Sequence, residues 1–170
     1  MNVVLCGFMG CGKSTIGRLL ARETGWSFVD MDQYIENRAG MTVSEIFRRL
    51  GEPHFRKLER EAAAFLAQGD RRIIAAGGGA LADSENAALL RQTGKIVYLQ
   101  VPLAVIERRL RNDHTRPLFS GKSHEERLAL YTERDGLYRA AADLAVSGDG
   151  QREEVVHRLQ ARLREEGLAV

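Results

Sequence analysis

Gly7-Phe8-Met9-Gly10-Cys11-Gly12-Lys13-Ser14, close to the N-terminus, matches the phosphate-binding pattern G-x-x-x-x-G-K-[ST] at every position. The residues before it, 2–6, form a short apolar run with β-branched members, as a buried parallel strand requires. After it, apolar residues recur at helical spacing up to Leu20, and Gly25 is suited to end a helix. Strand, loop and helix therefore follow one another in the order that a phosphate-binding loop needs.

The residue types in this loop explain how it would hold a phosphate. Because they lack β-carbons, Gly7, Gly10 and Gly12 allow successive N–H groups to face one anion, and the helix that follows adds its positive end. Lys13 can reach the outer phosphates of a nucleotide, and the Ser14 hydroxyl can ligate Mg²⁺. The alternative is a glycine-rich turn that happens to carry a lysine. It is disfavoured because the strand and the helix are both in place, so we expect a nucleotide-phosphate site.

The composition fits an ordinary globular protein and argues against several classes of partner. Of 170 residues, 44% are hydrophobic and 28% charged, so we expect one domain over residues 1–170. A net charge of +2 is too small to indicate nucleic acid or an anionic membrane as a partner. No apolar run has membrane-spanning length, and a strand that begins beside Met1 leaves no room for a signal peptide. The cysteines and histidines lack zinc-site or disulfide spacing. We expect a monomer in a reducing cytoplasm.

Strand-like and helix-like segments alternate along the chain. Strands are expected over residues 2–6, 27–30, 72–76, 96–99 and 143–146, with amphipathic helices between them and after the last. This alternation predicts an α/β fold in which helices cover both faces of a parallel sheet through right-handed crossovers. Ligands of such sheets bind beyond the carboxyl ends of the strands. The glycine loop, Asp30 and Gly77-Gly78-Gly79 all follow strands, so they should meet in one crevice.

Two further features follow strands and have polar character. Asp30 and Asp32 lie one residue apart after the second strand. Beside a nucleotide, one carboxylate can hold Mg²⁺ or its water shell while the other accepts a hydrogen bond from a substrate hydroxyl. The alternative, that Asp32 only caps the next helix, is less favoured next to a phosphate loop. The run Gly77-Gly78-Gly79 either offers backbone N–H groups to a ligand or forms only a tight turn.

Three arginines are also candidates, and each could instead be a surface residue. Arg56 and Arg134 lie on amphipathic helices, where each could simply be solvated or paired with a glutamate. Arg116-Pro117-Leu118 lies in a long polar loop with no sustained periodicity. A lid that closes over ATP would bring Arg116 to the transferring phosphoryl group, a role worth about 10³ to 10⁵ in rate. The alternative is a mobile surface loop.

Taken together, these segments resemble shikimate kinase over nearly the whole chain. The resemblance is carried by the loop at 7–14, Asp30-Met31-Asp32, Phe55-Arg56 with Glu59, Gly77-Gly78-Gly79, Arg116-Pro117-Leu118, and Arg134 four residues before Tyr138. It implies a P-loop fold like that of nucleoside monophosphate kinases, three layers deep with a five-stranded parallel sheet. A shikimate-binding region would lie at about 31–60 and a lid at about 111–123. The implied reaction transfers the γ-phosphoryl group of ATP to the 3-hydroxyl of shikimate in aromatic amino-acid biosynthesis.

The same resemblance implies roles for individual residues. The catalytic residues would be Lys13, Asp32 and Arg116. ATP would be bound by Gly10, Cys11, Gly12, Lys13, Ser14, Thr15, Arg109, Arg116 and Gln151. Shikimate would be bound by Asp32, Arg56, Gly77, Gly78, Gly79, Arg134, Phe47, Phe55, Pro117 and Leu118. Mg²⁺ would be held by Ser14 and, through water, by Asp30. Arg109 matches the arginine that stacks on adenine in the family.

The chain departs from the family between its last strand and last helix. Gly148-Asp149-Gly150-Gln151 lacks the proline often found there, so the individual adenine contacts stay open. Arg108 and Arg111 are alternatives to Arg109 as the stacking residue.

Two other functions remain open at this point. One is a kinase of another small hydroxylated acid such as gluconate, which also offers a carboxylate and a polyol. The other is an ATP-gated regulatory module, which should carry a large exposed apolar patch or an extra domain. The sequence indicates neither of these features.

Overall fold

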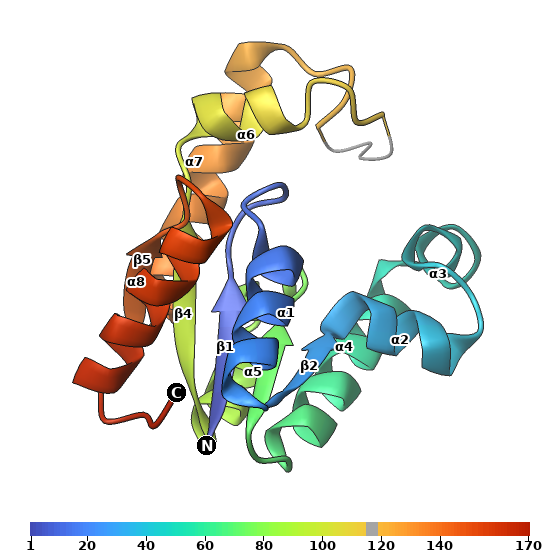
Figure 1. Ribbon diagram of the computed structural model, residues 1–170. Helices are drawn as coiled ribbons and strands as arrows, with labels where there is room; N and C mark the ends of the chain where they lie inside the picture. The colour runs from blue at the N-terminus through green and yellow to red at the C-terminus, as the bar shows by residue number, and fades with distance from the viewer. Residues whose placement is uncertain (115–118) are drawn as a thin grey trace.

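A computed structural model describes residues 1–114 and 119–170 of the chain (Figure 1). The predictions for Arg116, Pro117 and Leu118 lie outside the described residues. The strands are β1 (Asn2–Cys6), β2 (Ser27–Asp30), β3 (Arg72–Ala75), β4 (Gly94–Gln100) and β5 (Leu144–Ser147). The helices are α1 (Lys13–Thr24), α2 (Met31–Ala39), α3 (Val43–Leu50), α4 (Glu52–Ala67), α5 (Ser84–Arg91), α6 (Leu103–Arg109), α7 (His124–Ala141) and α8 (Arg152–Glu165), with a 3₁₀ turn η1 (Ala80–Ala82).

The five strands form one parallel sheet in the order β2-β3-β1-β4-β5. The expected five-stranded parallel sheet is therefore confirmed. β1 lies at its centre and all five of its residues are buried, which explains the apolar run from Val3 to Cys6. The chain passes from β1 to one edge of the sheet and returns through β3 to the other side at β4. The segments that follow β1 and β3 therefore leave from adjacent strand ends, the place where ligands bind such sheets.

Helices cover both faces of this sheet. On one face α1 packs against the sheet and against α8, while α5 and α7 pack on the other, with α4 beside α5. Figure 1 shows α2 and α3 beyond the β2 edge, on the right, and α6 above the carboxyl end of the sheet. None of the helices in the described part of the chain is both long and apolar enough to cross a membrane.

Local signals place most of the helix ends. The capping boxes at Thr42 with Glu45 and at Ser123 with Glu126 are both formed, and they begin α3 and α7. The N-cap of α2, however, is Asp30, whose Oδ1 accepts bonds from the N–H groups of Asp32 and Gln33 at 3.1 and 3.2 Å. The alternative in which Asp32 caps this helix is therefore wrong, and the Asp32 carboxylate is left for the cavity that it lines.

Candidate active site

The loop between β1 and α1 needs its glycines. Gly10 and Gly12 have φ angles of +75° and +97°, in the left-handed region that residues with a β-carbon avoid. At Gly7, a β-carbon would lie 2.8 Å from the carbonyl oxygen of Leu99 and 2.7 Å from the sulfur of Cys11. Gly12 is the N-cap of α1 and provides no side-chain cap, so the N–H groups of the first turn remain available to an anion.

Lys13 and Ser14 begin the helix that follows the loop. Lys13 Nζ donates to the carbonyl oxygen of Gly7 at 2.6 Å, so its ammonium group lies folded over the loop. Ser14 Oγ donates to Asp30 Oδ2 at 2.7 Å, which places a hydroxyl and a carboxylate side by side at the carboxyl ends of β1 and β2. Hard oxygen atoms of this kind suit Mg²⁺, which uses one or two protein ligands and keeps several waters. The described residues contain no cluster of three or more His, Cys, Asp or Glu that would form an all-protein metal cage.

A large cavity of about 940 Å³ opens over this loop. It brings together all the predicted ATP-binding residues that the structure describes: Gly10, Cys11, Gly12, Lys13, Ser14, Thr15, Arg109 and Gln151. Its other walls come from α6, from the segment between β5 and α8, and from the start of α8. They include Arg108, the alternative to Arg109 as the stacking residue, and Arg152, which the sequence analysis did not select. Arg111 is not among its lining residues and instead lines a separate hollow beside α6.

Arg109 connects three parts of the large cavity. Its guanidinium group donates to the carbonyl oxygens of Gly10 and Cys11 at 3.2 and 3.3 Å, and to that of Gly148 at 3.3 Å. It thereby joins α6 to the glycine loop and to the segment after β5. Stacking of Arg109 on adenine stays a prediction, and it would require this guanidinium to rearrange.

A smaller cavity of about 260 Å³ lies next to the large one. It is lined by every predicted shikimate-binding residue that the structure describes: Asp32, Arg56, Gly77, Gly78, Gly79, Arg134, Phe47 and Phe55. Met9 and Lys13 line both cavities, so the two meet at the glycine loop. The predicted crevice at the carboxyl edge is therefore present, and it has two compartments.

The small cavity holds closely packed charges. Burial and, next, the charge of Asp30 raise the pKa of Asp32 above its usual value. Arg56 Nη1 donates to Oε1 of Glu59 at 2.5 Å, and Glu59 is only 1% exposed. Burial raises the pKa of Glu59, although the Arg56 guanidinium opposes that shift. Arg56 therefore forms ion pairs with Glu52 and Glu59, as expected if it were an arginine paired with glutamates. It also lines the small cavity, as expected for a substrate-binding residue.

Two glycines after β3 are required by their neighbours in this cavity. A β-carbon at Gly77 would lie 2.6 Å from Asp32 Oδ1, and one at Gly79 would lie 2.8 Å from Arg56 Nη1. Any larger residue would displace one of the two charged groups. The glycine run thus does more than turn the chain, because it leaves room for both side chains.

Sequence reasoning did not select several residues that line this cavity, among them Met9, Glu59 and Tyr138. Glu59 was considered only as a possible ion-pair partner of Arg56, Tyr138 only as part of a spacing pattern, and Met9 only as a variable position of the loop. The three-residue spacing between Arg56 and Glu59 on a helix favours their ion pair, and that part of the alternative interpretation is confirmed. Nothing in the local sequence connects Tyr138 with the glycine run.

The chain was compared with known proteins. The family model described as shikimate kinase matches residues 9–164. The chain belongs to the shikimate kinase family. The shikimate kinase of Geobacter sulfurreducens is 46% identical over 166 residues, which cover 96% of this chain and 91% of that protein.

Solved structures of shikimate kinases agree with this family over the whole fold. The crystal structure from Aquifex aeolicus has a TM-score of 0.87 at 34% identity and covers 100% of both chains. The structure from Acinetobacter baumannii, in complex with shikimate, has a TM-score of 0.86 at 35% identity and covers 96% of this chain and 93% of that one. As a shikimate kinase family member, the chain is an ATP-dependent kinase, so the regulatory-module alternative is not retained.

Proposed function

We propose that this protein transfers the γ-phosphoryl group of ATP to the 3-hydroxyl of shikimate, giving shikimate 3-phosphate and ADP. One observation carries the proposal: a nucleotide-sized cavity and a smaller cavity meet at Lys13. The smaller one has two arginines for a carboxylate and one aspartate for hydroxyls. This combination matches a compact polyhydroxylated acid that must approach the terminal phosphate of ATP.

The glycine loop and Lys13 are proposed to hold the phosphates. Free N–H groups at the start of α1 would face the phosphate oxygens, with Lys13 leaving the Gly7 carbonyl to reach the outer ones. Ser14, and Asp30 through water, would hold Mg²⁺, which when bound neutralises charge on the phosphate oxygens. Their adjacent oxygens, 2.7 Å apart, support that assignment. Arg116 would balance charge on the transferring group, and Pro117 and Leu118 would contact the substrate.

Substrate orientation is assigned to the small cavity. Arg56 and Arg134 would bind the carboxylate through charge-assisted hydrogen bonds worth about 1.5–3 kcal/mol each. Asp32 would accept hydrogen bonds from ring hydroxyls and orient the attacking one. Phosphoryl transfer passes through a loose transition state, so positioning and charge stabilisation supply most of the catalysis. Phe47 and Phe55, with ring centroids 4.7 Å apart, would pack against the apolar part of the ring.

The test is ADP release with Mg·ATP against shikimate, gluconate and nucleoside monophosphates. Release with shikimate alone, and a product whose mass equals phosphorylated shikimate, is the expected result. Release with gluconate instead would retain the phosphate site and refute the assignment of the small cavity. The proposal also includes a monomer acting in the cytoplasm as one domain over residues 1–170. Light scattering of the purified protein would test the monomer.

A further inference from the structure

In the turn that follows β3, the backbone carbonyl oxygens are hydrogen-bonded. Each carbonyl from Gly77 to Ala80 accepts a hydrogen bond from within the fold. The carbonyl of Gly77 accepts from the Ala80 N–H, and that of Gly79 from the Ala82 N–H, both at 3.1 Å. The carbonyl of Gly78 accepts from the Tyr138 hydroxyl at 2.8 Å, and that of Ala80 from Asn86 Nδ2 at 2.9 Å. Two of these four donors are side chains, one from α5 and one from α7.

The N–H groups of the same turn remain open. Within residues 1–114 and 119–170, the N–H groups of Gly77, Gly78 and Gly79 donate to no acceptor. Buried backbone donors are almost always paired in folded proteins, and Gly77 is buried. Three consecutive free donors beside a cavity are therefore available to a ligand or water. The turn therefore has unpaired donors at the wall of the cavity, while its acceptors are occupied by the surrounding fold.

The Gly78 carbonyl differs from the others because it has two donors. One is the Tyr138 hydroxyl, and the second is Arg134 Nη1 at 3.0 Å. Arg134 is one of the two arginines assigned to the substrate carboxylate, and without substrate its guanidinium binds a carbonyl of the protein. If it turns toward a carboxylate, the Tyr138 hydroxyl is the donor that remains on that oxygen.

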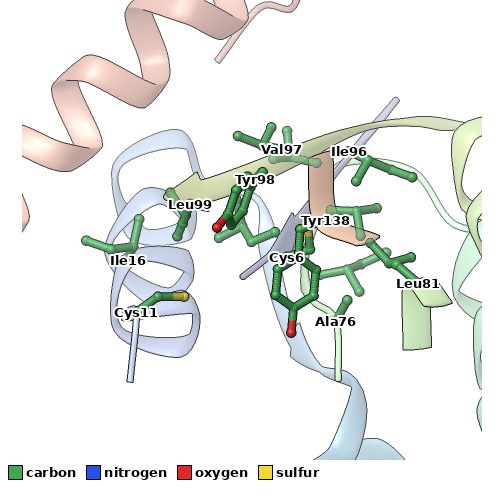
Figure 2. Packing of buried hydrophobic residues seen from close by; sticks show 14 of the residues in the cluster. Cys6, Cys11, Ile16, Ala76, Leu81, Ile96, Val97, Tyr98, Leu99 and Tyr138 are labelled. Carbon is green, nitrogen blue, oxygen red and sulfur yellow. The ribbon is translucent and has the colours of Figure 1, made fainter. Parts of the chain in front are cut away.

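Tyr138 is held rigidly enough for this task. Its side chain is 3% exposed, and its ring lies 5.4 Å from that of Tyr98. Figure 2 shows the ring within the same group of buried side chains as Cys6, Ala76 and Leu81, with the hydroxyl pointing out of the group. Burial raises the pKa of Tyr138, so the hydroxyl keeps its proton and acts as a donor.

We propose that Tyr138 is a positioning residue for the acceptor substrate, acting through the Gly78 carbonyl. This inference rests on the proposed function. No peptide bond in the described chain is cis, and in a trans peptide the carbonyl of Gly78 and the N–H of Gly79 point in opposite directions. Fixing the carbonyl toward α7 therefore fixes the Gly79 N–H on the side away from α7. Because the Tyr138 hydroxyl stays bonded to the Gly78 carbonyl, Arg134 can leave that oxygen and bind the substrate carboxylate instead.

The test compares Tyr138→Phe with Tyr131→Phe. Tyr131 lies on the same helix and its hydroxyl also donates to a backbone carbonyl, that of Val101 at 2.7 Å, but it does not line the small cavity. Loss of the Tyr138 hydroxyl is expected to raise the KM for shikimate about three- to tenfold, the effect of one net hydrogen bond, while the KM for ATP stays within about twofold. Tyr131→Phe should change neither constant. Equal effects of the two variants on shikimate, or equal changes of both KM values in Tyr138→Phe, would overturn the inference.

A second measurement does not depend on which substrate is used. Amide exchange is recorded by NMR for the N–H groups of Ala80 and Ala82, which close the turn, in the substrate-free protein. Both should exchange faster in Tyr138→Phe than in wild type or Tyr131→Phe, because one anchor of the turn is lost. Exchange that is unchanged would refute the anchoring role. A wild-type protein that neither binds nor phosphorylates shikimate would instead refute the proposed function, and the exchange comparison would still decide whether Tyr138 holds the turn.

Discussion

Asp32 has a polar function in a half-buried location. Its carboxylate must be ionised to accept hydrogen bonds from substrate hydroxyls, yet burial and the neighbouring Asp30 both favour its protonated form and raise its pKa. An ionised Asp32 therefore costs folding free energy at neutral pH. Residues of active sites often retain such a cost because function requires it.

Asp32→Asn should separate these two effects. We expect kcat with shikimate to fall at least about a hundredfold, while the Kd for ATP changes by less than about threefold, because the side chain lines only the small cavity. The variant should also have a higher Tm than wild type at pH 7. Because the folded-state pKa is raised, this gain should shrink as the pH falls through that pKa, where wild-type Asp32 becomes protonated.

Asp135 provides the control for that pH dependence. Burial opposes the shift, but hydrogen bonds from Arg139 and Tyr98 lower the pKa of Asp135. Asp135→Asn should therefore lower the Tm at pH 7, and this loss should shrink as the pH falls and wild-type Asp135 is protonated. If calorimetry from about pH 2 to 8, a range that includes the lowered pKa of Asp135, gave the two variants the same sign, the electrostatic account of Asp32 would be wrong.

Arg56→Ala should weaken substrate binding and folding together. We expect the KM for shikimate to rise about ten- to hundredfold, the loss of a charge-assisted bond. The Tm should fall as well, because Glu59 stays buried without the guanidinium that bonds it at 2.5 Å. Adding Glu59→Gln should restore part of the Tm but not the KM.

Arg60 is a matched control for Arg56 on the same helix. It forms a 3.4 Å ion pair with Asp83, and its side chain is 45% exposed and does not line the small cavity. Arg60→Ala should leave the KM for shikimate unchanged. An equal rise in KM in both variants would argue against a specific carboxylate contact at Arg56.

At the scale of elements, the sequence predicted what local chemistry controls. Apolar residues at helical spacing indicated the helices between the strands, and an apolar run with β-branched members located β1. The ends of β4 were missed because Gly94 and Gln100, weak strand formers, join the strand through pairing with β1 and β5. The 3₁₀ turn η1 was missed because its bonds reach back into the glycine run and forward to Asn86, outside any local pattern.

Substitution of two helical glycines by alanine should change the free energy of unfolding in opposite directions. In α1, a β-carbon at Gly17 would lie 2.5 Å from Cε2 of Phe28, so Gly17→Ala should cost about 1–3 kcal/mol by overpacking the helix against β2. In α7, nothing lies within 4 Å of a β-carbon at Gly136, so Gly136→Ala should gain about 0.5–1 kcal/mol from helix propensity. Urea denaturation would measure both. A destabilised Gly136→Ala would show that this helix is constrained by something other than propensity.

At the scale of the molecule, topology predicted where the site lies but not how its parts connect. The rule that ligands bind beyond the strand ends correctly placed Asp30, the glycine loop and the glycine run in one crevice. It could not predict the bond from Tyr138 to Gly78, or those from Arg109 to Gly10 and Gly148. These contacts join residues far apart in the chain, and their geometry depends on how whole helices pack on the sheet.

ATP and shikimate should each raise the free energy of unfolding by binding to its own cavity. At a concentration of 100 times its Kd, either ATP or shikimate should add about 2.7 kcal/mol, or about 5–10 °C in Tm. Lys13→Met should reduce the shift with ATP and abolish turnover while a shift with shikimate remains. Differential scanning fluorimetry would measure these shifts. A loss of both shifts in Lys13→Met would mean that the variant disrupts the fold of the loop rather than one contact.

The meeting of the two cavities at Met9 and Lys13 has a consequence for inhibitor chemistry. One molecule could join an adenine nucleotide to a cyclic hydroxy acid by a short bridge across these two residues. Once one half is bound, the other half is held close to its own cavity at a high effective concentration. The joined compound should therefore bind far more tightly than either half alone. The bridge would have to be short, because it replaces the single phosphoryl group that passes between the compartments.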